Sequence, residues 1–547
     1  MQTSDPFAID STTYFDRAVN WLRLGRLNSL LILWTFVLVA VLYFICVGML
    51  ETGPINCFSN DALILLDGGW RLLNGQVPHR DFYSALGPLE YMITASGMLL
   101  THSSPQGIAI GNVVFGAIAG IWGWLLSRQR MAALPSLLVV TWLILTATSP
   151  TPLGSAPSVM SCAMIYNRHA YALLGIVLVE CAVESERGRF WGAFSSGVAL
   201  VLMGFLKLNF FGAAGILLLA SAWIRREEMT RVWGVLLGAA CTAAVFVLCL
   251  RDAIFAFFSD MLFAIQSRSS GLSLERVARG IIGCADTEIV PLAAIMSVMA
   301  ILLIARGRFW QRQTVKVALL SGIVLATGPL FCLTNASETG CTLATLWVIL
   351  LLGMLMVAYP KSKEKAVIAA VIAMSLGGVA ASYSRDATCM LALMRDSSAR
   401  YRSLGVGLAA PGMERLRFYE SEGAYANENG HLYVARLDDG LALPTRLSTP
   451  EESVVSLGFH NPFSYVLRRK PAEGGSPWLL VDNNISRSHM LEASRVFGNA
   501  DLVMVPDYEG LNRESDLYIQ EAYHLYLSQH FDFVARSPLW LLYRRKK

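Results

Sequence analysis

The sequence predicts a polytopic α-helical membrane protein that carries a soluble α/β domain at its C-terminal end. Three observations predict it: a low share of charged residues, a series of long apolar runs, and a rise in charge after residue 382. Of the 547 residues, 54% are apolar and only 15% are charged, whereas soluble domains average about 25% charged residues. This composition excludes an ordinary cytosolic enzyme and a disordered or fibrous protein.

The apolar runs are long enough to cross a bilayer, which takes about 20 helical residues. A further apolar helix over 88–101 is short, and we expect it to lie at the outer interface. The run 189–224 is too long for one span, so we expect it to break at Lys207. Eleven transmembrane helices are therefore expected, near 28–50, 107–127, 132–149, 169–184, 190–206, 208–224, 232–250, 286–305, 315–334, 341–359 and 365–382.

The distribution of Lys and Arg orients these helices, because positive residues concentrate in cytoplasmic loops. With residues 1–27 placed in the cytoplasm, the inner loops carry 17 Lys and Arg residues and the outer loops carry 8. We therefore expect residues 28–382 to form the membrane domain, with its first outer loop at 51–106. An odd number of spans places the C-terminus outside.

The charge content changes at the end of the last predicted span. Residues 1–382 hold 45 charged residues, about 12%, and residues 383–547 hold 39, about 24%. The second value is ordinary for a soluble domain. The residue pattern predicts strands at 478–482, 502–506 and 540–543 and helices at 486–497 and 515–530. We expect a small α/β domain outside the membrane.

Charge and cysteine content narrow the classes of partner. The net charge is only +4, and no basic patch is interleaved with aromatic residues, so nucleic acid is not an expected partner. The ten cysteines and eight histidines lack the spacing of a zinc site. Cys332 and Cys341 flank one short loop and either pair in an oxidising compartment or stay reduced.

The first outer loop holds the most informative residues. Asp61, Asp67 and Asp81 lie within 21 residues, and an amphipathic helix over 60–74 is expected to end at Gly75. Acids at the edge of a bilayer act as a general base or coordinate a divalent metal ion.

Each of these acids also has a structural interpretation. Asp61 sits where it could cap the amino-terminal end of the helix. Asp67 and Arg71 are four residues apart, the spacing of an ion pair on a helix surface. Asp81 sits where it could order the turn that precedes Phe82.

The order of elements in this region resembles that of the GT-C superfamily, the integral-membrane glycosyltransferases that use polyprenyl-phosphate sugars. The resemblance rests on a single span followed by Asp61, on the turn at 75–82 (GQVPHRDF) and on the interfacial helix that starts at 87–91 (GPLEY). The chain is most similar to the bacterial branch of lipopolysaccharide-core galacturonosyl, aminoarabinose and protein mannosyl transferases. It departs from the Asp-Glu pair of several branches, because Ala62 follows Asp61.

The resemblance implies an inverting sugar transfer on the outer face of a bacterial inner membrane. The donor would be a polyprenyl-phosphate-linked sugar, and the acceptor a glycan, a glycolipid or a protein. Asp61 occupies the position of the base and Asp81 that of a second loop acid, with Mg²⁺ or Mn²⁺ as an open alternative at these two acids. Arg80, Glu90 and Tyr91 belong to the shared motifs and are further candidates for substrate binding.

The leaving phosphate requires positive charge at the outer surface. Lys207 lies between two apolar runs, where a lysine either has a function or extends its amine to the interface. Arg168 and His169 lie where a loop re-enters the membrane, and the alternative role is an anchor at the headgroup level. Arg268 lies in the longest internal outer loop and is either a phosphate ligand or a solvated charge.

Two other classes of function remain open at this point. A transporter or flippase of a lipid-linked sugar would show paired halves and charged residues near the midplane. Here the charges cluster at loop boundaries and the soluble domain is appended at one end only, which favours the enzyme. The other class is a non-catalytic scaffold of the cell envelope whose outer domain binds a partner.

Overall fold

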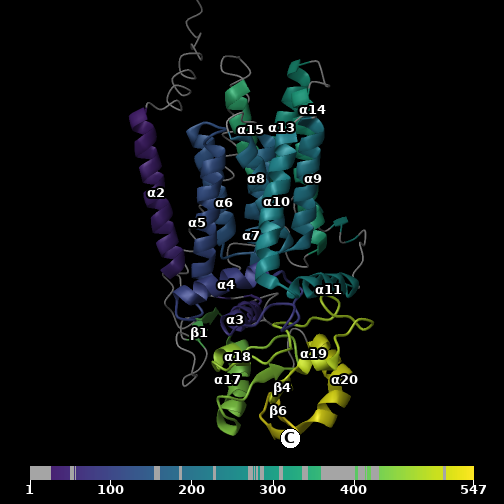
Figure 1. Ribbon diagram of the computed structural model, residues 1–547. Helices are drawn as coiled ribbons and strands as arrows, with labels where there is room; N and C mark the ends of the chain where they lie inside the picture. Colours follow the sequence, from purple (N-terminus) through teal and green to yellow (C-terminus); the bar gives the residue numbers. More distant parts are fainter. Residues whose placement is uncertain are drawn as a thin grey trace, which may run out of the picture.

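The molecule has three layers: a bundle of long helices, a thin layer of shorter helices at one end of the bundle, and an α/β domain beyond that layer (Figure 1). The computed structural model describes residues 26–547 except for 50–54, 56, 153–159, 184–187, 226–228, 269–274, 276, 279–280, 284–288, 307–311, 335–342, 359–400, 404–412, 414–415, 420–429 and 509–512.

Ten of the eleven predicted spans are helices, with bounds within four residues of the expected ones. The eleventh, 365–382, lies outside the described residues, as do nearly all of residues 1–27. Cys341 also lies outside them, so the pairing of Cys332 with Cys341 stays open. The bundle consists of α2 (Arg26–Met49), α5 (Gly107–Ser127), α6 (Ala133–Thr148), α7 (Ile165–Ala182), α8 (Arg189–Gly204), α9 (Leu208–Arg225), α10 (Met229–Leu250), α13 (Ile289–Arg306), α14 (Arg312–Thr334) and α15 (Leu343–Ala358).

The surface of the bundle is apolar. Among the described helices, α5 and α10 are each long and apolar enough to cross a membrane, and several shorter apolar helices accompany them. Trp34, Leu219 and Leu248 are each more than two-thirds exposed. Exposed apolar surface of this extent marks contact with a membrane or a partner. The number of spans and their orientation in the membrane remain predictions.

The direction in which the first helices run can be followed in the fold. Helix α2 begins at the end of the bundle farthest from the α/β domain, and α5 starts at the opposite end, beside α4, and runs away from that domain (Figure 1). The loop with Arg128 and Arg130 therefore lies at the end opposite the α/β domain.

The long apolar run breaks at the predicted point. Helix α8 ends at Gly204 and α9 begins at Leu208, with Lys207 between them. The last carbonyl groups of a helix have no partner within it, and here the segment at Gly87 supplies the donors. The Gly87 N–H donates to Leu206 O at 3.3 Å. A Cβ at Gly87 would lie 1.9 Å from Phe205 O, so only glycine fits this approach.

Three helices form the layer at the end of the bundle: α3 (Asn60–Leu73), α4 (Pro88–Leu100) and α11 (Ala253–Gln266). Helices α4 and α11 lie across the bundle end rather than along it (Figure 1), as expected for the helix over 88–101. Helix α3 ends before Gly75, whose φ of 83° suits glycine. Helix α11 was not expected, because the sequence analysis placed this segment in the longest internal outer loop without a helix. Its residues Phe255 and Phe258 are exposed.

The C-terminal domain is built on a four-stranded mixed sheet in the order β3-β4-β6-β5, in which β3 and β4 are parallel and the other pairs antiparallel. A two-stranded sheet of β1 and β2 lies apart from it. The elements are β1 (Tyr401–Ser403), β2 (Arg417–Tyr419), α17 (Gly430–Leu447), β3 (Val454–Ser456), α18 (Phe463–Val466), α19 (Ala493–Phe497), β4 (Leu502–Pro506), α20 (Arg513–His530), β5 (Phe531–Arg536) and β6 (Trp540–Arg545).

The strands at 502–506 and 540–543 and the helix at 515–530 are confirmed, and two predicted elements are wrong. Residues 478–482 form no strand: Trp478 and Val481 make only isolated bridges, and a turn follows at 482–484. The side-chain oxygen of Asn484 accepts the Leu480 N–H at 2.7 Å in place of a neighbouring strand. Of the helix expected over 486–497, only Ala493–Phe497 is helical. The Ser486 hydroxyl accepts the His489 N–H at 3.1 Å, and such local side-chain bonds compete with a helix.

Candidate active site

A cavity of about 660 Å³ lies where the three layers meet. The bundle supplies the segment around the start of α7 and the break before α9, the thin layer supplies α3 and α11, and the α/β domain covers the opposite side. Its lining residues are Phe58, Asn60, Asp61, Ile64, Leu65, Ala85, Leu86, Cys162, Ala163, Met164, Tyr166, Lys207, Leu208, Asn209, Met261, Ala264, Ile265, Arg268, Phe459, Trp478, Leu480 and Asn483.

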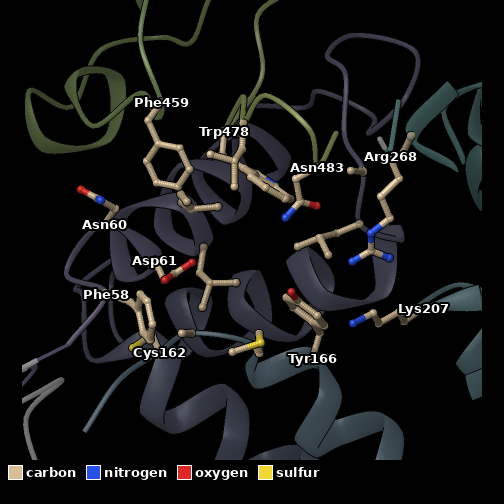
Figure 2. Close-up of a pocket in the computed structure, with 18 of the residues that line it drawn as sticks. Phe58, Asn60, Asp61, Cys162, Tyr166, Lys207, Arg268, Phe459, Trp478 and Asn483 are labelled. Atoms are coloured by element: carbon tan, nitrogen blue, oxygen red, sulfur yellow. The ribbon is translucent and has the colours of Figure 1, made fainter. Parts of the chain in front are cut away.

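Asp61 lies in the first turn of α3 and is half-buried. Its carboxylate points into the cavity (Figure 2). The helix begins at Asn60 with Ser59 in the capping position, so the interpretation of Asp61 as the N-cap is wrong. The unpaired N–H groups of a first helical turn favour negative charge. The helix therefore presents a carboxylate to the cavity.

Two predicted cations lie on the side of the cavity away from Asp61 (Figure 2). The Lys207 ammonium donates to the side-chain oxygen of Asn167 at 2.9 Å and stands 4.9 Å from the centre of the Tyr166 ring. Arg268 is exposed just beyond the C-terminal end of α11. The cavity thus has an acidic side and a basic side.

The α/β domain contributes a roof of Phe459, Trp478, Leu480 and Asn483. Sequence reasoning did not single out Phe459 or Trp478 as binding residues, and Asn483 lies just after the strand that was expected at 478–482. The one local signal is the run Gly474-Gly-Ser-Pro before Trp478, which predicts a loop without indicating where that loop packs.

Arg168 and His169 are buried in the bundle end rather than exposed to the cavity. The Arg168 guanidinium donates to the carbonyl groups of Ser161 and Ala163 at 2.9 Å each. Arg168 therefore holds segment 161–163 in place, and Cys162 and Ala163 of this segment line the cavity. His169 lies 2.9 Å from the Glu90 carboxylate and so joins α7 to α4.

The remaining motif residues also lie outside the cavity lining. Tyr91 is buried, and its hydroxyl lies 3.0 Å from that of Ser84. The Asp81 carboxylate accepts hydrogen bonds from the Val77 N–H at 2.7 Å and from Arg80 at 2.8 Å. Partial burial raises the pKa of Asp81, but these hydrogen bonds outweigh burial and lower the pKa below its usual value. The structure supports the turn-ordering interpretation of this acid.

Cys162 is the one nucleophilic thiol in the lining. Burial raises its pKa to about 12, although Arg168 acts in the opposite direction. A thiol with such a pKa stays protonated at neutral pH, and the thiolate is the reactive form. Covalent catalysis by this cysteine is therefore not supported.

Asp67 and Arg71 do pair, at 2.8 Å, but the pair is completely buried rather than on the surface. Burial raises the pKa of Asp67, against the lowering effect of Arg71. Arg71 also donates to the carbonyl groups of Ala472 and Gly474, at 3.1 and 3.0 Å. This group fastens α3 to the α/β domain.

A second fastener joins the α/β domain to α11. Asp260 of α11 lies 3.0 Å from the ring nitrogen Nδ1 of His79 and 2.7 Å from the guanidinium of Arg495 in α19. The Tyr83 hydroxyl donates to Asn484 O at 2.6 Å, beside the roof residue Asn483. Together these contacts hold the roof over the cavity.

Among the described residues, metal ligands do not gather at this site. Within the described residues, no group of three His, Cys, Asp or Glu side chains could hold a metal ion. Of the two acids that were candidates for Mg²⁺ or Mn²⁺, only Asp61 lines the cavity.

No family model matches the chain, and no curated protein matches it. Among solved structures, the chain is similar to ArnT from Cupriavidus metallidurans in the apo state, with 14% sequence identity and a TM-score of 0.48, and to the same protein bound to undecaprenyl phosphate, with 13% identity and a TM-score of 0.47. Each similarity covers 93% of this chain and 97% of the other.

Proposed function

We propose that the chain is a GT-C-type glycosyltransferase of a bacterial inner membrane. It moves a sugar from a polyprenyl-phosphate carrier to a glycan, glycolipid or protein acceptor on the outer face. The observation that carries this proposal is the cavity at the end of the bundle, where one carboxylate faces two cations. The motifs at Asp61, 75–82 and 87–91 support it independently of that geometry.

The residues of the cavity fit the two halves of the reaction. The Asp61 carboxylate accepts the proton of the acceptor hydroxyl, whose oxygen then forms a bond to the anomeric carbon of the sugar. The bond between that carbon and the phosphate oxygen breaks, and its electron pair stays on the leaving polyprenyl phosphate. Lys207 and Arg268 stabilise the charge that develops on the phosphate. Attack from the side opposite the phosphate inverts the anomeric configuration.

The arrangement of the layers suits a lipid-linked donor. The apolar residues Leu208, Met261 and Ile265 line the cavity beside the two cations. A prenyl chain partitions into apolar surroundings while its phosphate requires positive charge. The cavity offers both at the predicted edge of the bilayer, so the donor enters from the membrane and the acceptor from the α/β domain.

The decisive variant is Asp61→Asn, which removes the base and keeps the shape of the side chain. We expect the rate of transfer to fall about 10³-fold, within the usual effect of a general base. The measurement is mass spectrometry of envelope glycans and glycolipids from cells that lack the chain and are complemented with either form.

Asp252→Asn is the matched control, since Asp252 is exposed outside the cavity lining and pairs only loosely with Arg80 at 3.7 Å. Transfer at the wild-type rate by folded Asp61→Asn protein would disprove the mechanism. Translocation of a lipid-linked sugar without any glycosidic product would identify a flippase instead. Chelation of divalent cations in the same assay tests for a contribution of Mg²⁺ or Mn²⁺.

A further inference from the structure

The roof of the cavity differs in chemistry from its floor. The floor carries Asp61, Lys207 and Arg268, whereas the roof presents the rings of Phe459 and Trp478. The centres of these two rings are 6.4 Å apart, with an interplanar angle of 68°. Both side chains are only half-buried although they belong to a folded domain. The roof is therefore an aromatic surface that faces the cavity.

The roof also carries polar side-chain groups that have no hydrogen-bond partner among the described residues. The Asn483 side chain points into the cavity between Trp478 and Arg268 (Figure 2), and its amide forms no hydrogen bond with the described residues. The indole N–H of Trp478 likewise has no acceptor among the described residues. An amide supplies both donors and an acceptor.

The neighbouring residues hold this roof in place, which a binding surface requires. The Asn484 side chain is fully buried, accepts the Leu480 N–H at 2.7 Å and donates to Trp478 O at 3.0 Å. The Asp516 carboxylate accepts the Phe459 N–H at 2.6 Å. These contacts fix the two roof loops from behind and leave their faces toward the cavity.

This combination matches the chemistry of a sugar ring. A pyranose has an apolar face of C–H groups and an edge of hydroxyl groups. Aromatic side chains offer large apolar faces at low entropic cost, and a few placed polar groups orient a bound molecule. In Figure 2 the ring of Phe459 lies above Asp61, and Asn483 lies toward the cations. A sugar under this roof would present a hydroxyl group to the Asp61 carboxylate.

We propose that Phe459, Trp478 and Asn483 form a subsite for a sugar ring of the acceptor. The inference rests on the proposed function and deepens it, because it selects a glycan or glycolipid acceptor over a polypeptide. Phe459 and Trp478 stack against the ring, and the Asn483 amide hydrogen-bonds its hydroxyl groups. The α/β domain then supplies the acceptor half of the active site, and the membrane helices supply the donor half.

The test places a photoreactive group in the roof of the full-length protein. Leu480 lines the cavity and lies between Trp478 and Asn483 in the sequence. It is replaced by p-benzoylphenylalanine in the Asp61→Asn background, where the acceptor is not consumed. After irradiation of cells, the purified protein is digested and its adducts are analysed by mass spectrometry. The control carries the same group at Leu525, which is exposed on α20 outside the cavity lining.

We expect an adduct with the fragment ions of hexose or aminosugar units at position 480 and none at position 525. Trp478→Leu should reduce its yield about tenfold, and Trp478→Phe, which keeps an aromatic face, should reduce it less. All these variants should retain binding of undecaprenyl phosphate, which reports on the donor half and on folding.

The failures of the two proposals are distinguishable. A peptide adduct, a prenyl adduct alone, or no sugar adduct from protein that still binds undecaprenyl phosphate would overturn the subsite while leaving the transferase proposal intact. A sugar adduct that depends on Trp478, together with full transfer by the Asp61→Asn variant, would support the subsite and disprove the catalytic role of Asp61.

Discussion

Two acidic residues of the same short helix, Asp61 and Asp67, have different surroundings. Asp61 is half-buried at the cavity, whereas Asp67 is completely buried. The six-residue step from Asp61 to Asp67 turns the helix by about 600°, so the two side chains leave it in directions about 120° apart. Asp67 is paired at 2.8 Å with Arg71, which is itself bound to backbone carbonyl groups of the α/β domain.

The charged residues of this loop therefore have two different roles, one structural and one proposed to be catalytic. A buried pair whose arginine is also hydrogen-bonded to the α/β domain stabilises one arrangement of two domains and has no access to substrate. A carboxylate at the wall of a cavity remains accessible to a substrate hydroxyl. The same loop therefore provides both the connection between the domains and the proposed base.

The largest expected loss of stability comes from Arg71→Met, which leaves Asp67 buried without its partner. Breaking a buried ion pair costs about 3–5 kcal/mol, so we expect the apparent melting temperature to fall strongly and proteolysis to release the α/β domain. Arg80→Met is the control, because its pair with Asp81 is partly exposed and such pairs contribute about 0–1 kcal/mol. Equal loss of stability in both variants would contradict the assignment of Arg71 as the fastener.

At the cavity, Lys207→Met should weaken the donor half of the site without unfolding the protein. We expect the Kd for undecaprenyl phosphate to rise at least about tenfold, equivalent to about 1.4 kcal/mol, because a charge-assisted contact is lost. Binding is measured on protein in lipid nanodiscs at fixed ionic strength. Lys470→Met, at an exposed lysine of the α/β domain outside the cavity lining, should leave this Kd unchanged. An unchanged Kd in Lys207→Met would remove Lys207 from the phosphate site.

The last expected effect concerns Asp516, which supports the roof, and it appears only when the pH is changed. Burial raises its pKa from 3.8 to about 7, against the lowering effects of the Phe459 N–H and of Arg436. Between these values the folded protein keeps a proton that the unfolded chain has released, so stability falls as the pH rises from about 4 to 7. The slope is at most about 1.4 kcal/mol per pH unit.

Asp516→Asn keeps an oxygen for the Phe459 N–H and cannot ionise, so this slope should disappear from melting curves recorded between pH 5 and 7.5. Asp532→Asn is the control, because Asp532 is exposed and the variant should follow the wild-type curve. Identical slopes in Asp516→Asn and wild-type protein would show that Asp516 is not buried as a neutral acid.

The membrane part of the fold was predicted more completely than the α/β domain. The bounds of ten helices were predicted to within four residues. A long apolar run in a bilayer has few alternatives to a helix, because its backbone groups must bond to one another. In the α/β domain, the apolar run at 478–482 was mistaken for a strand. Its backbone groups are bonded by Asn484 instead, a local competition that periodicity does not reveal.

The site was predicted in part. Asp61, Lys207 and Arg268 line the cavity, and their roles as base and phosphate ligands stay predictions. Arg168 and His169 were also candidates for substrate binding, but they are buried among protein groups. The sequence could not reveal this, because charge and position do not show which way a side chain points. The roof residues were missed because Phe459 lies about 400 residues from Asp61 along the chain.

By itself the sequence determined which segments are apolar enough to leave water, where the long run had to break, and which loop concentrates the acids. These are local properties, because the transfer of a side chain between water and an apolar phase depends mainly on that side chain. Only the tertiary structure decided which charges face the cavity and which are buried. That choice follows from the docking of the α/β domain onto α3 and α11, which buries Asp67 and Asp260 and leaves Asp61 beneath an aromatic roof.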